Sequence, residues 1–460
     1  MATYSAYDQL LLELVNRARM DPLGEAARLG IDLNAGLAAG TISATPKQPL
    51  APNNNLVTAA RAHSQFMIDT DQFNHAGIGD GTPASRMQAA GYALTGSWAA
   101  GENIAWVGTT GTVDRLASTL NIADNLFRSA GHRVNTLNDS FRELGTGVVE
   151  GPFKSGAYTY NAVMATENFG LSGGKIFVSG VAINDLDGDN FYDIGEARGG
   201  ISVSVSTLGV LDGTDITEAA GGYGIGVRAG SHTVTFSSAD LAAPVNVTVM
   251  AASANVKVDL AGTGEILSSV SAALGTGAKD LSLLGASAIN GTGNAENNVL
   301  TGNRAANVLT GGDGNDTLIG AGGFDTLVGG QGADILTGGA GWDKLTGGAD
   351  ADVFDFNTVV EIGKILGTRD VVTDFQTGMD IIDVSTIDAN GALAGVTAFS
   401  WRGTGAFTGA AGQLQYTVVD LAGTVDDRTV VQGDINGDRL ADFQIHINGV
   451  IKLAVTDFVL

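Results

Sequence analysis

Acidic and amide side chains recur at every ninth position between residues 298 and 352. The series is Asn298, Asn307, Asp316, Asp325, Asp334, Asp343 and Asp352. An apolar residue follows each of them two positions later, and glycine pairs stand between them at 311–312, 329–330, 338–339 and 347–348. Stacked carboxylates repel one another unless a cation lies between them, and Ca2+ takes about six to eight oxygen ligands. The spacing therefore predicts calcium binding.

A nine-residue period also predicts a coiled backbone. One glycine-rich turn and one short strand fit in each unit, so two units close a coil and turns i and i+2 stack. Glycine permits positive φ and close approach of the backbone to an ion. The strongest sites should pair Asp316 with Asp334, Asp325 with Asp343, and Asp334 with Asp352, whereas the Asn298 and Asn307 turns should bind weakly or not at all. The candidate roll ligands are Asp313, Asp316, Asp325, Asp334, Asp343, Asp350 and Asp352.

This run matches the pattern G-G-x-G-x-D-x-U-x and resembles the RTX repeats, which form calcium-binding parallel β-rolls. RDVVTDFQTGMDIIDVSTIDAN (369–390) and VVQGDINGDRLADFQIHING (430–449) resemble the region that follows the roll in serralysin-type proteins, and the ending VTDFVL resembles a type I secretion signal. The resemblance covers about residues 280–460. It implies a type I secretion apparatus as partner, export in an unfolded state, and folding outside the cell on Ca2+.

A second acidic stretch is NDLDGDNFYDIGEARGG (184–200). Its spacing matches the ligand positions 1, 3, 5, 7, 9 and 12 of an EF-hand loop. The residues at these positions are, in order, Asp185, Asp187, Asp189, Phe191, Asp193 and Glu196. Asn190 stands at the sixth position, which glycine usually holds. The flanking segments alternate like strands, so an EF-hand helix pair is not expected. The stretch resembles the calcium loop of SdrD-B or Cna-B-like β-sandwich modules, and a solvated acidic turn is the alternative.

A weaker calcium candidate lies in GDINGDRLAD. Residues with side-chain oxygens alternate with other residues in this segment. The segment is short and has no bidentate Glu, so a hairpin turn is an equal alternative. The candidate ligands are Asp434, Asn436, Asp438 and Asp442.

Three of the five histidines lie in the first 172 residues: His63, His75 and His132. Together with Glu102 in GENIAW they have the residue types that bind divalent metals or perform acid–base chemistry. His75, Glu102 and His132 are the candidate catalytic residues, and they could hold Zn2+ with positions left for water. A buried polar network is the alternative. His63 fits a packed or capping role better, and no Ser–His–Asp motif is attached to Ser64.

The same block resembles the CAP superfamily in its bacterial SCP-like form. The matching pieces are LVNRARMDP, AHSQFM, FNHAG, GENIAW, SAGHRVNTL, ELGTGV and TENFG. The family's cleft of two His and acidic residues carries over by motif to His75, Glu102 and His132. Eukaryotic members add a second Glu from the helix before the last His; NLFRSAGHR has none, and Glu143 lies in another segment.

Composition and charge limit the class of protein. The net charge is −25, and residues 171–460 hold 34 acidic against 13 basic residues, which disfavours nucleic acid and anionic membranes. The absence of cysteine excludes disulfides and thiolate metal sites. The opening MATYSAYDQLLLELVNRARM is not expected to be a signal peptide, and no run of about eighteen apolar residues predicts a transmembrane helix. We expect an extracellular protein secreted without an N-terminal signal.

These features predict a multidomain chain. An N-terminal α+β CAP sandwich (1–172) precedes a small SdrD-B-like β-sandwich (173–262), a linker (263–285), a parallel β-roll (286–356) and a β-rich C-terminal cap with the secretion signal (357–460). The leading hypothesis is a secreted calcium-binding protein whose CAP domain binds an extracellular lipid, peptide or polysaccharide. A metal-dependent hydrolase and a surface or matrix adhesion protein are the alternatives.

Overall fold

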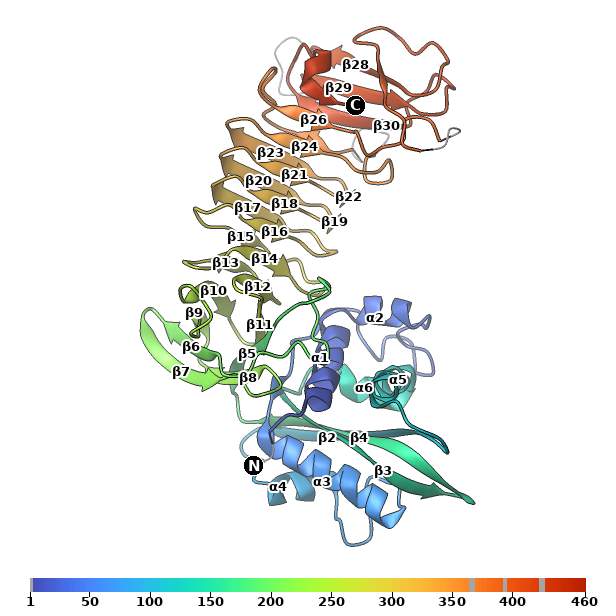
Figure 1. Cartoon of the computed structure of the whole chain (residues 1–460), viewed down its shortest axis with the longest axis vertical. Helices are drawn as coiled ribbons and strands as arrows, with labels where there is room; N and C mark the ends of the chain where they lie inside the picture. The colour runs from blue at the N-terminus through green and yellow to red at the C-terminus, as the bar shows by residue number, and fades with distance from the viewer. Residues whose placement is uncertain (1–2, 364–368, 392–394, 422–426) are drawn as a thin grey trace. The chain divides into compact units, whose positions relative to one another are not determined.

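The computed structural model describes residues 3–363, 369–391, 395–421 and 427–460. The chain forms two compact units, Met1–Ser269 and Val270–Leu460 (Figure 1). Both predicted boundaries at 172 and 262 lie inside the first unit. Parts of the predicted regions 1–172 (residues 1–2) and 357–460 (residues 364–368, 392–394 and 422–426) lie outside the described residues. In the described part of the chain, no helix combines the length and the apolar character needed to cross a bilayer.

The helix–sheet part of the first unit ends at Ser172. Its four strands have the order β1-β3-β4-β2, with β1 parallel to β3 and the other pairs antiparallel. The elements are α1 (Ala6–Met20), α2 (Pro22–Arg28), β1 (Ala51–Pro52), α3 (Asn54–Thr70), α4 (Pro83–Ala89), β2 (Trp98–Thr109), α5 (Arg115–Arg128), α6 (Ala130–Thr136), β3 (Glu143–Ser155) and β4 (Tyr158–Ser172).

Local sequence sets the limits of α1. Ser5 and Asp8 form a reciprocal capping box at its start. The helix stops at Met20, because Asp21 caps the next helix and Pro22 cannot continue an α-helix.

Helices lie on both faces of the sheet (Figure 1). Alternate residues of β4 point to opposite sides: Val163 packs with Leu11 of α1, whereas Met164 packs with Met67 of α3. Gly147 brings α3 directly onto β3, because a Cβ there would lie 2.3 Å from the backbone nitrogen of Arg61.

The two-sheet part of the first unit begins at Ile176. Its sheets have the orders β10-β9-β6-β7 and β12-β11-β5-β8. The ring of Tyr223 meets that of Phe236 across them, edge to face at 5.8 Å. The strands are β5 (Ile176–Ile183), β6 (Ser202–Thr207), β7 (Val210–Ile216), β8 (Gly222–Val227), β9 (Gly230–Ser237), β10 (Val245–Ala251), β11 (Val256–Ala261) and β12 (Glu265–Ser268).

Buried polar contacts join the two parts of the first unit. Lys257 Nζ on β11 lies 3.0 Å from Glu13 Oε2 on α1, and it also pairs with Asp259. Asn255 Nδ2 donates to the carbonyl of Pro49 at 3.1 Å. Glu13 and Lys257, like Pro49 and Asn255, are more than 200 residues apart in sequence.

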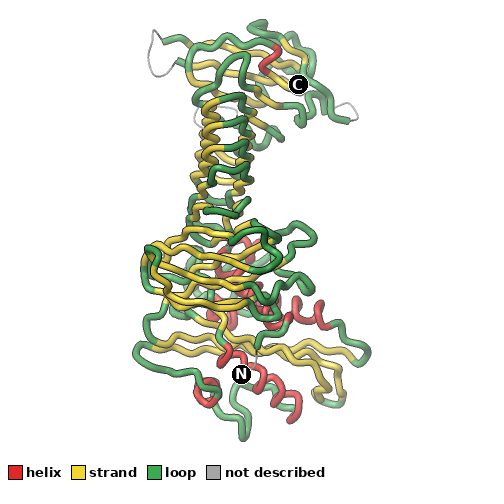
Figure 2. Tube along the Cα trace, turned by 60° about the vertical axis from the view of Figure 1, so that its left-hand side comes forward, coloured by secondary structure: helices red, strands yellow, loops and turns green. Residues whose placement is uncertain are grey.

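The second unit is built on two parallel ladders, which Figure 2 shows as successive yellow rungs. One has the order β13-β15-β17-β20-β23-β25-β30 and the other β14-β16-β18-β21-β24-β26-β31. In the repeat region, partners are eighteen residues apart, as in Leu309↔Leu327↔Leu345. The apolar residues at the nine-residue spacing, from Leu300 to Phe354, are fully buried.

The repeat strands and their entry are β13 (Ala272–Leu274), β14 (Asp280–Leu283), β15 (Gly291–Thr292), β16 (Val299–Thr301), β17 (Val308–Asp313), β18 (Thr317–Ile319), β19 (Gly322–Gly323), β20 (Thr326–Gln331), β21 (Ile335–Thr337), β22 (Ala340–Gly341), β23 (Lys344–Ala349) and β24 (Val353–Asp355). The C-terminal elements are β25 (Val371–Val372), β26 (Ile381–Asp383), β27 (Ser400–Trp401), β28 (Gln413–Val419), β29 (Arg428–Asp434), β30 (Phe443–Asn448), η1 (Val455–Asp457) and β31 (Phe458–Val459).

Candidate calcium sites and a buried His–Glu cluster

The repeat aspartates form two hydrogen-bonded columns. One oxygen of each carboxylate accepts the backbone N–H of the residue eighteen positions earlier, as in Asp316 N to Asp334 Oδ1 (2.8 Å) and Asp325 N to Asp343 Oδ1 (2.8 Å). Asp334 N donates to Asp352 Oδ1 in the same way at 3.0 Å. The predicted i, i+2 stacking thus places the expected pairs next to each other.

The second oxygen of each repeat carboxylate is buried and has no protein partner among the described residues. The atoms concerned are Oδ2 of Asp316, Asp325, Asp334, Asp343 and Asp352. Burial raises the pKa of Asp325 and Asp352 to about 7, and that of Asp334 and Asp343 to about 6. A buried acceptor without a donor is costly, and a cation removes that cost.

Glycines keep these oxygens accessible. A Cβ on Gly329 would lie 2.2 Å from Asp334 Oδ2 and 2.6 Å from the carbonyl oxygen of Gly347, and a Cβ on Gly347 would lie 2.2 Å from Asp352 Oδ2. Carboxylate and carbonyl oxygens therefore converge where only glycine leaves room. This donor set fits Ca2+, which prefers oxygen ligands of this kind.

Two residues that sequence reasoning missed extend the columns. Asp343 N donates to Asp370 Oδ1 at 2.9 Å, and Asp352 N donates to Asp380 Oδ1 at 3.2 Å. The spacings are 27 and 28 residues instead of eighteen, so a strict period does not find them. Burial raises the pKa of Asp370 to about 8.

The other candidate roll ligands lie outside the columns. Asp313 is exposed and accepts the side-chain amide of Gln331 at 2.7 Å. Asp350 is also exposed, in a left-handed backbone conformation with φ 76°. Asn298 Oδ1 accepts the backbone N–H of Asn294 at 2.8 Å, so this amide closes its own turn.

The acidic loop between β5 and β6 brings three carboxylates together. Ligand atoms of Asp185, Asp187 and Asp189 lie within 4.8 Å of one another, the one such group of three among the described His, Cys, Asp and Glu residues. Glu196 is buried, and its oxygens accept the backbone N–H groups of Leu186 and Asp193 at 2.7 and 3.2 Å.

Asn190 in this loop has φ 58°, the left-handed conformation expected at that position. Burial, followed by repulsion from Asp189, raises the pKa of Asp193. Phe191, at the seventh position of the predicted loop, lies beside helix α1, with the guanidinium of Arg17 5.1 Å from its ring centre.

The candidate loop at 434–442 is a hydrogen-bonded turn. Asp434 Oδ1 accepts Gly437 N at 2.7 Å, and Asp442 Oδ2 accepts Ile435 N at 2.9 Å. Asp438 Oδ1 accepts Leu440 N at 2.8 Å, and Asn436 Oδ1 accepts Asp438 N at 2.8 Å. These oxygens bind the turn's own backbone, and the calcium assignment there stays a prediction.

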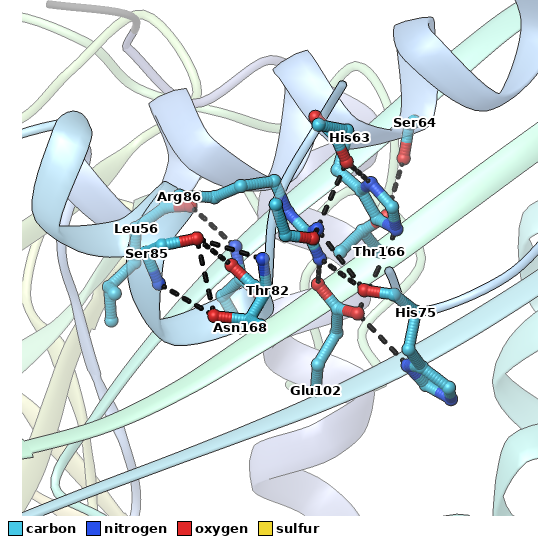
Figure 3. Close-up of polar contacts among 12 residues, drawn as sticks. Leu56, His63, Ser64, His75, Thr82, Ser85, Arg86, Glu102, Thr166 and Asn168 are labelled. Carbon is cyan, nitrogen blue, oxygen red and sulfur yellow. Dashed lines mark hydrogen bonds and ion pairs between the residues drawn. The ribbon is translucent and has the colours of Figure 1, made fainter. Parts of the chain in front are cut away.

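In the helix–sheet part, Glu102 on β2 is the centre of a charged cluster (Figure 3). Its Oε1 lies 2.9 Å from His75 Nδ1, and its Oε2 accepts a hydrogen bond from Arg86 Nη2 at 2.5 Å. Arg86, from α4, also pairs with Asp80 at 3.0 Å. Glu102 and Arg86 are buried, while the side chain of His75 is 51% exposed.

His63 on α3 belongs to this cluster. Its Nδ1 lies 2.5 Å from Asp80 Oδ2, and its Nε2 lies 3.7 Å from Glu102 Oε1. The ring is buried, and burial lowers the pKa of His63. His63 is buried, as expected for a packed residue, but its ring also faces Glu102. Sequence reasoning missed Asp80 and Arg86, because they lie in GIGDGTPASR, a segment that matches none of the CAP motifs.

His132 on α6 stands apart from these contacts. Its Nδ1 lies 2.8 Å from Ser129 Oγ. Burial, and then the neighbouring His75, lower the pKa of His132. Glu143 accepts hydrogen bonds from Tyr92 Oη and Asn53 Nδ2, both at 2.7 Å.

Ser64 is engaged in the core. Its hydroxyl bonds the carbonyl of Gly147 and the hydroxyl of Thr166, both at 2.8 Å.

Two protein-family models match the chain, one in its N-terminal part and one in the repeat region. The model of the cysteine-rich secretory protein (CAP) family matches residues 12–165, and the RTX calcium-binding nonapeptide repeat matches residues 292–327 and 319–354. No curated protein matches the chain. The chain thus carries an N-terminal CAP domain and RTX calcium-binding repeats, which support a secreted calcium-binding protein.

Two solved structures show partial likeness. An extracellular SCP-domain protein from Bacillus anthracis is 23% identical, with 34% of this chain and 40% of that chain covered and a TM-score of 0.21. A subunit of the Azotobacter vinelandii mannuronan C5-epimerase is 28% identical, with 36% and 78% covered and a TM-score of 0.20. This chain therefore spans less than half the length of the Bacillus protein.

Proposed function

We propose that this protein is exported by a type I secretion system, that its roll folds on extracellular Ca2+, and that its CAP domain binds a ligand or partner through the region around His75 and Glu102. The calcium-dependent part of this proposal rests on five buried Oδ2 atoms in consecutive repeats, none of which accepts a hydrogen bond from the described residues. Stacked carboxylates in that state resist folding until a divalent cation binds, so metal binding and folding are coupled.

The experiment is a Ca2+ titration of the full chain after dialysis against a chelator. Calorimetry should show several calcium ions bound, and far-UV circular dichroism should show strand signal appearing over the same range. Mg2+ is the matched control, because its preference for a smaller, octahedral shell makes it a poor substitute. A chain with full strand signal before Ca2+ is added would contradict the coupling.

The ligand-binding role of the CAP domain is supported by the contrast within its cluster. His75 is exposed beside a buried carboxylate, so an incoming polar group can reach its ring while Glu102 and Arg86 stay fixed. Binding to vesicles, peptides and polysaccharides should be compared for the wild type, His75→Ala and the neighbouring exposed control Asn74→Ala. At least one probe class should lose affinity in His75→Ala alone.

A metal-dependent hydrolase remains the second candidate, with Glu102 as general base and Zn2+ on His75, Glu102 and His132. The contacts of Glu102 disfavour it, because Arg86 already neutralises the carboxylate and would compete with a metal ion. Stoichiometric Zn2+ binding, lost in His75→Ala/His132→Ala, would reverse this preference.

Adhesion through residues 173–460 is tested by cell and matrix binding of the full chain with and without Ca2+.

A further inference from the structure

A small pocket lies in the first unit, where the start of helix α1 meets strands β7 and β8. Its volume is about 110 Å3, which is room for roughly four water molecules at about 30 Å3 each. The residues that matter are Gln9, Asp215, Glu218 and the two tyrosines Tyr4 and Tyr223. The pocket contains none of the candidate calcium or CAP residues and is independent of the proposed function.

The amide oxygen of Gln9 is the first sign of a ligand. Gln9 is 1% exposed, and its Nε2 donates to Glu13 Oε1 at 2.7 Å, which fixes the orientation of the amide. No donor among the described residues reaches Oε1. Gly222 lines the same pocket and packs closely against that oxygen, because a Cβ there would lie 2.3 Å from it.

Two carboxylates supply negative charge to the same space. Glu218 accepts the backbone N–H of Tyr4 and the side-chain amide of Asn54, both at 2.8 Å. Asp215 Oδ2 accepts Gly224 N at 2.9 Å. Every donor that the structure describes for these two residues is a neutral N–H group, so no cationic side chain among the described residues pairs with either carboxylate.

The tyrosines contribute aromatic surface. Their hydroxyls donate elsewhere, Tyr4 to the carbonyl of Leu144 and Tyr223 to that of Val258. Burial raises the pKa of both, and nearby carboxylates add to the increase. Aromatic rings next to carboxylates attract cations through the ring quadrupole.

We propose that this pocket binds a primary ammonium group. Such a group has three N–H donors, which match one amide oxygen and two carboxylates. Ca2+ is a poorer fit, because it needs about six to eight oxygens, and the amide of Gln9 with the two carboxylates supplies five at most. The ammonium group can come from a free small amine or from a lysine side chain.

The test is calorimetry on the full chain at constant saturating Ca2+, with ethylammonium as probe. Tetramethylammonium has the same charge without N–H donors, and ethanol has the size without the charge. We expect ethylammonium to bind at least tenfold more tightly than either. Equal binding of ethylammonium and tetramethylammonium, or no binding of ethylammonium, would overturn the proposal and leave water as the occupant.

Two substitutions locate the site. Gln9→Met removes the free oxygen, and Glu218→Gln removes one charge while keeping an acceptor for one of its two donors, the Tyr4 N–H or the Asn54 amide. Each should weaken ethylammonium binding at least tenfold, whereas the exposed control Asp69→Asn should change it less than twofold. If Gln9→Met does not fold, Glu218→Gln alone decides, and unchanged affinity there rejects the site.

A further comparison identifies the source of the ammonium group. Nα-acetyl-lysine amide that binds as tightly as ethylammonium, and loses affinity in Glu218→Gln, assigns a lysine side chain. Binding of ethylammonium alone assigns a free amine. Displacement of ethylammonium by Mg2+ at equal concentration would instead assign a metal site and overturn the proposal.

Discussion

At the scale of single residues, burial changes the chemistry of carboxylates far from any candidate site. Glu167 on β4 is 1% exposed and accepts one hydrogen bond, from Asn103 Nδ2 at 2.9 Å. Burial raises its pKa to about 7. The folded chain therefore holds a proton on Glu167 that the unfolded chain has lost between about pH 4.5 and pH 7.

The first prediction follows from this proton. The stability from neutral Glu167 is fully present below about pH 4.5 and is lost as pH rises to about 7, which amounts to roughly 3 kcal/mol. Glu167→Gln keeps the acceptor and removes the charge, so the variant should gain about that much over wild type at pH 8 and little at pH 4.5. Urea unfolding of both proteins at the two pH values measures the difference; an equal gain at both would contradict it.

The second prediction concerns the buried ion pair between Glu102 and Arg86, next to His75. Glu102→Gln leaves Arg86 buried with only Asp80 as its charged partner, so the variant should lose about 3 kcal/mol of unfolding free energy. Glu150→Gln, exposed on β3, is the control and should cost less than about 0.5 kcal/mol. An unchanged midpoint of thermal unfolding in Glu102→Gln would show that the pair contributes nothing.

At the scale of elements, periodic sequence predicted structure well. The nine-residue spacing predicts both the eighteen-residue strand register and the fully buried positions from Leu300 to Phe354. The columns continue to Asp370 and Asp380 through longer connections that carry no period. Motif matching found His75 and Glu102 but missed Asp80 and Arg86, because nothing local marks a residue whose partner lies on another element.

The third prediction tests the glycine turns of the roll. Gly329→Ala places a methyl group against Asp334 Oδ2 and the Gly347 carbonyl, so calcium affinity should fall about tenfold, equivalent to about 1.4 kcal/mol. Gly391→Ala, whose Cβ would meet only Asp388 Oδ2 at 3.9 Å, is the control. Calorimetric Ca2+ titration of both variants is the measurement, and equal affinities would argue against a metal at this turn.

At the scale of the whole molecule, composition predicted several domains, yet the first two predicted regions form one compact unit. Glu13 and Lys257 meet in its interior, and no property of either segment alone indicates the pairing. Burial raises the pKa of Asp259 to about 6 despite the adjacent Lys257. The unit therefore depends on charges that offset one another.

The fourth prediction measures that dependence. Lys257→Met leaves Glu13 and Asp259 buried without their cation and should cost about 3 to 5 kcal/mol. The triple variant Glu13→Leu/Lys257→Met/Asp259→Leu should recover most of the loss, because apolar replacements remove the unpaired charges together. Thermal unfolding of the three proteins is the measurement; a triple variant no more stable than Lys257→Met would contradict the account.

The eighteen-residue register of the roll also limits how its length can change. Removal of eighteen residues takes out one full coil, so β25 and β26 would still join the same ladders. Removal of nine residues takes out half a coil and would send each downstream strand to the opposite sheet. Insertions and deletions in the gene should therefore survive in multiples of fifty-four nucleotides, and a single-unit change should be tolerated only when a second restores the phase.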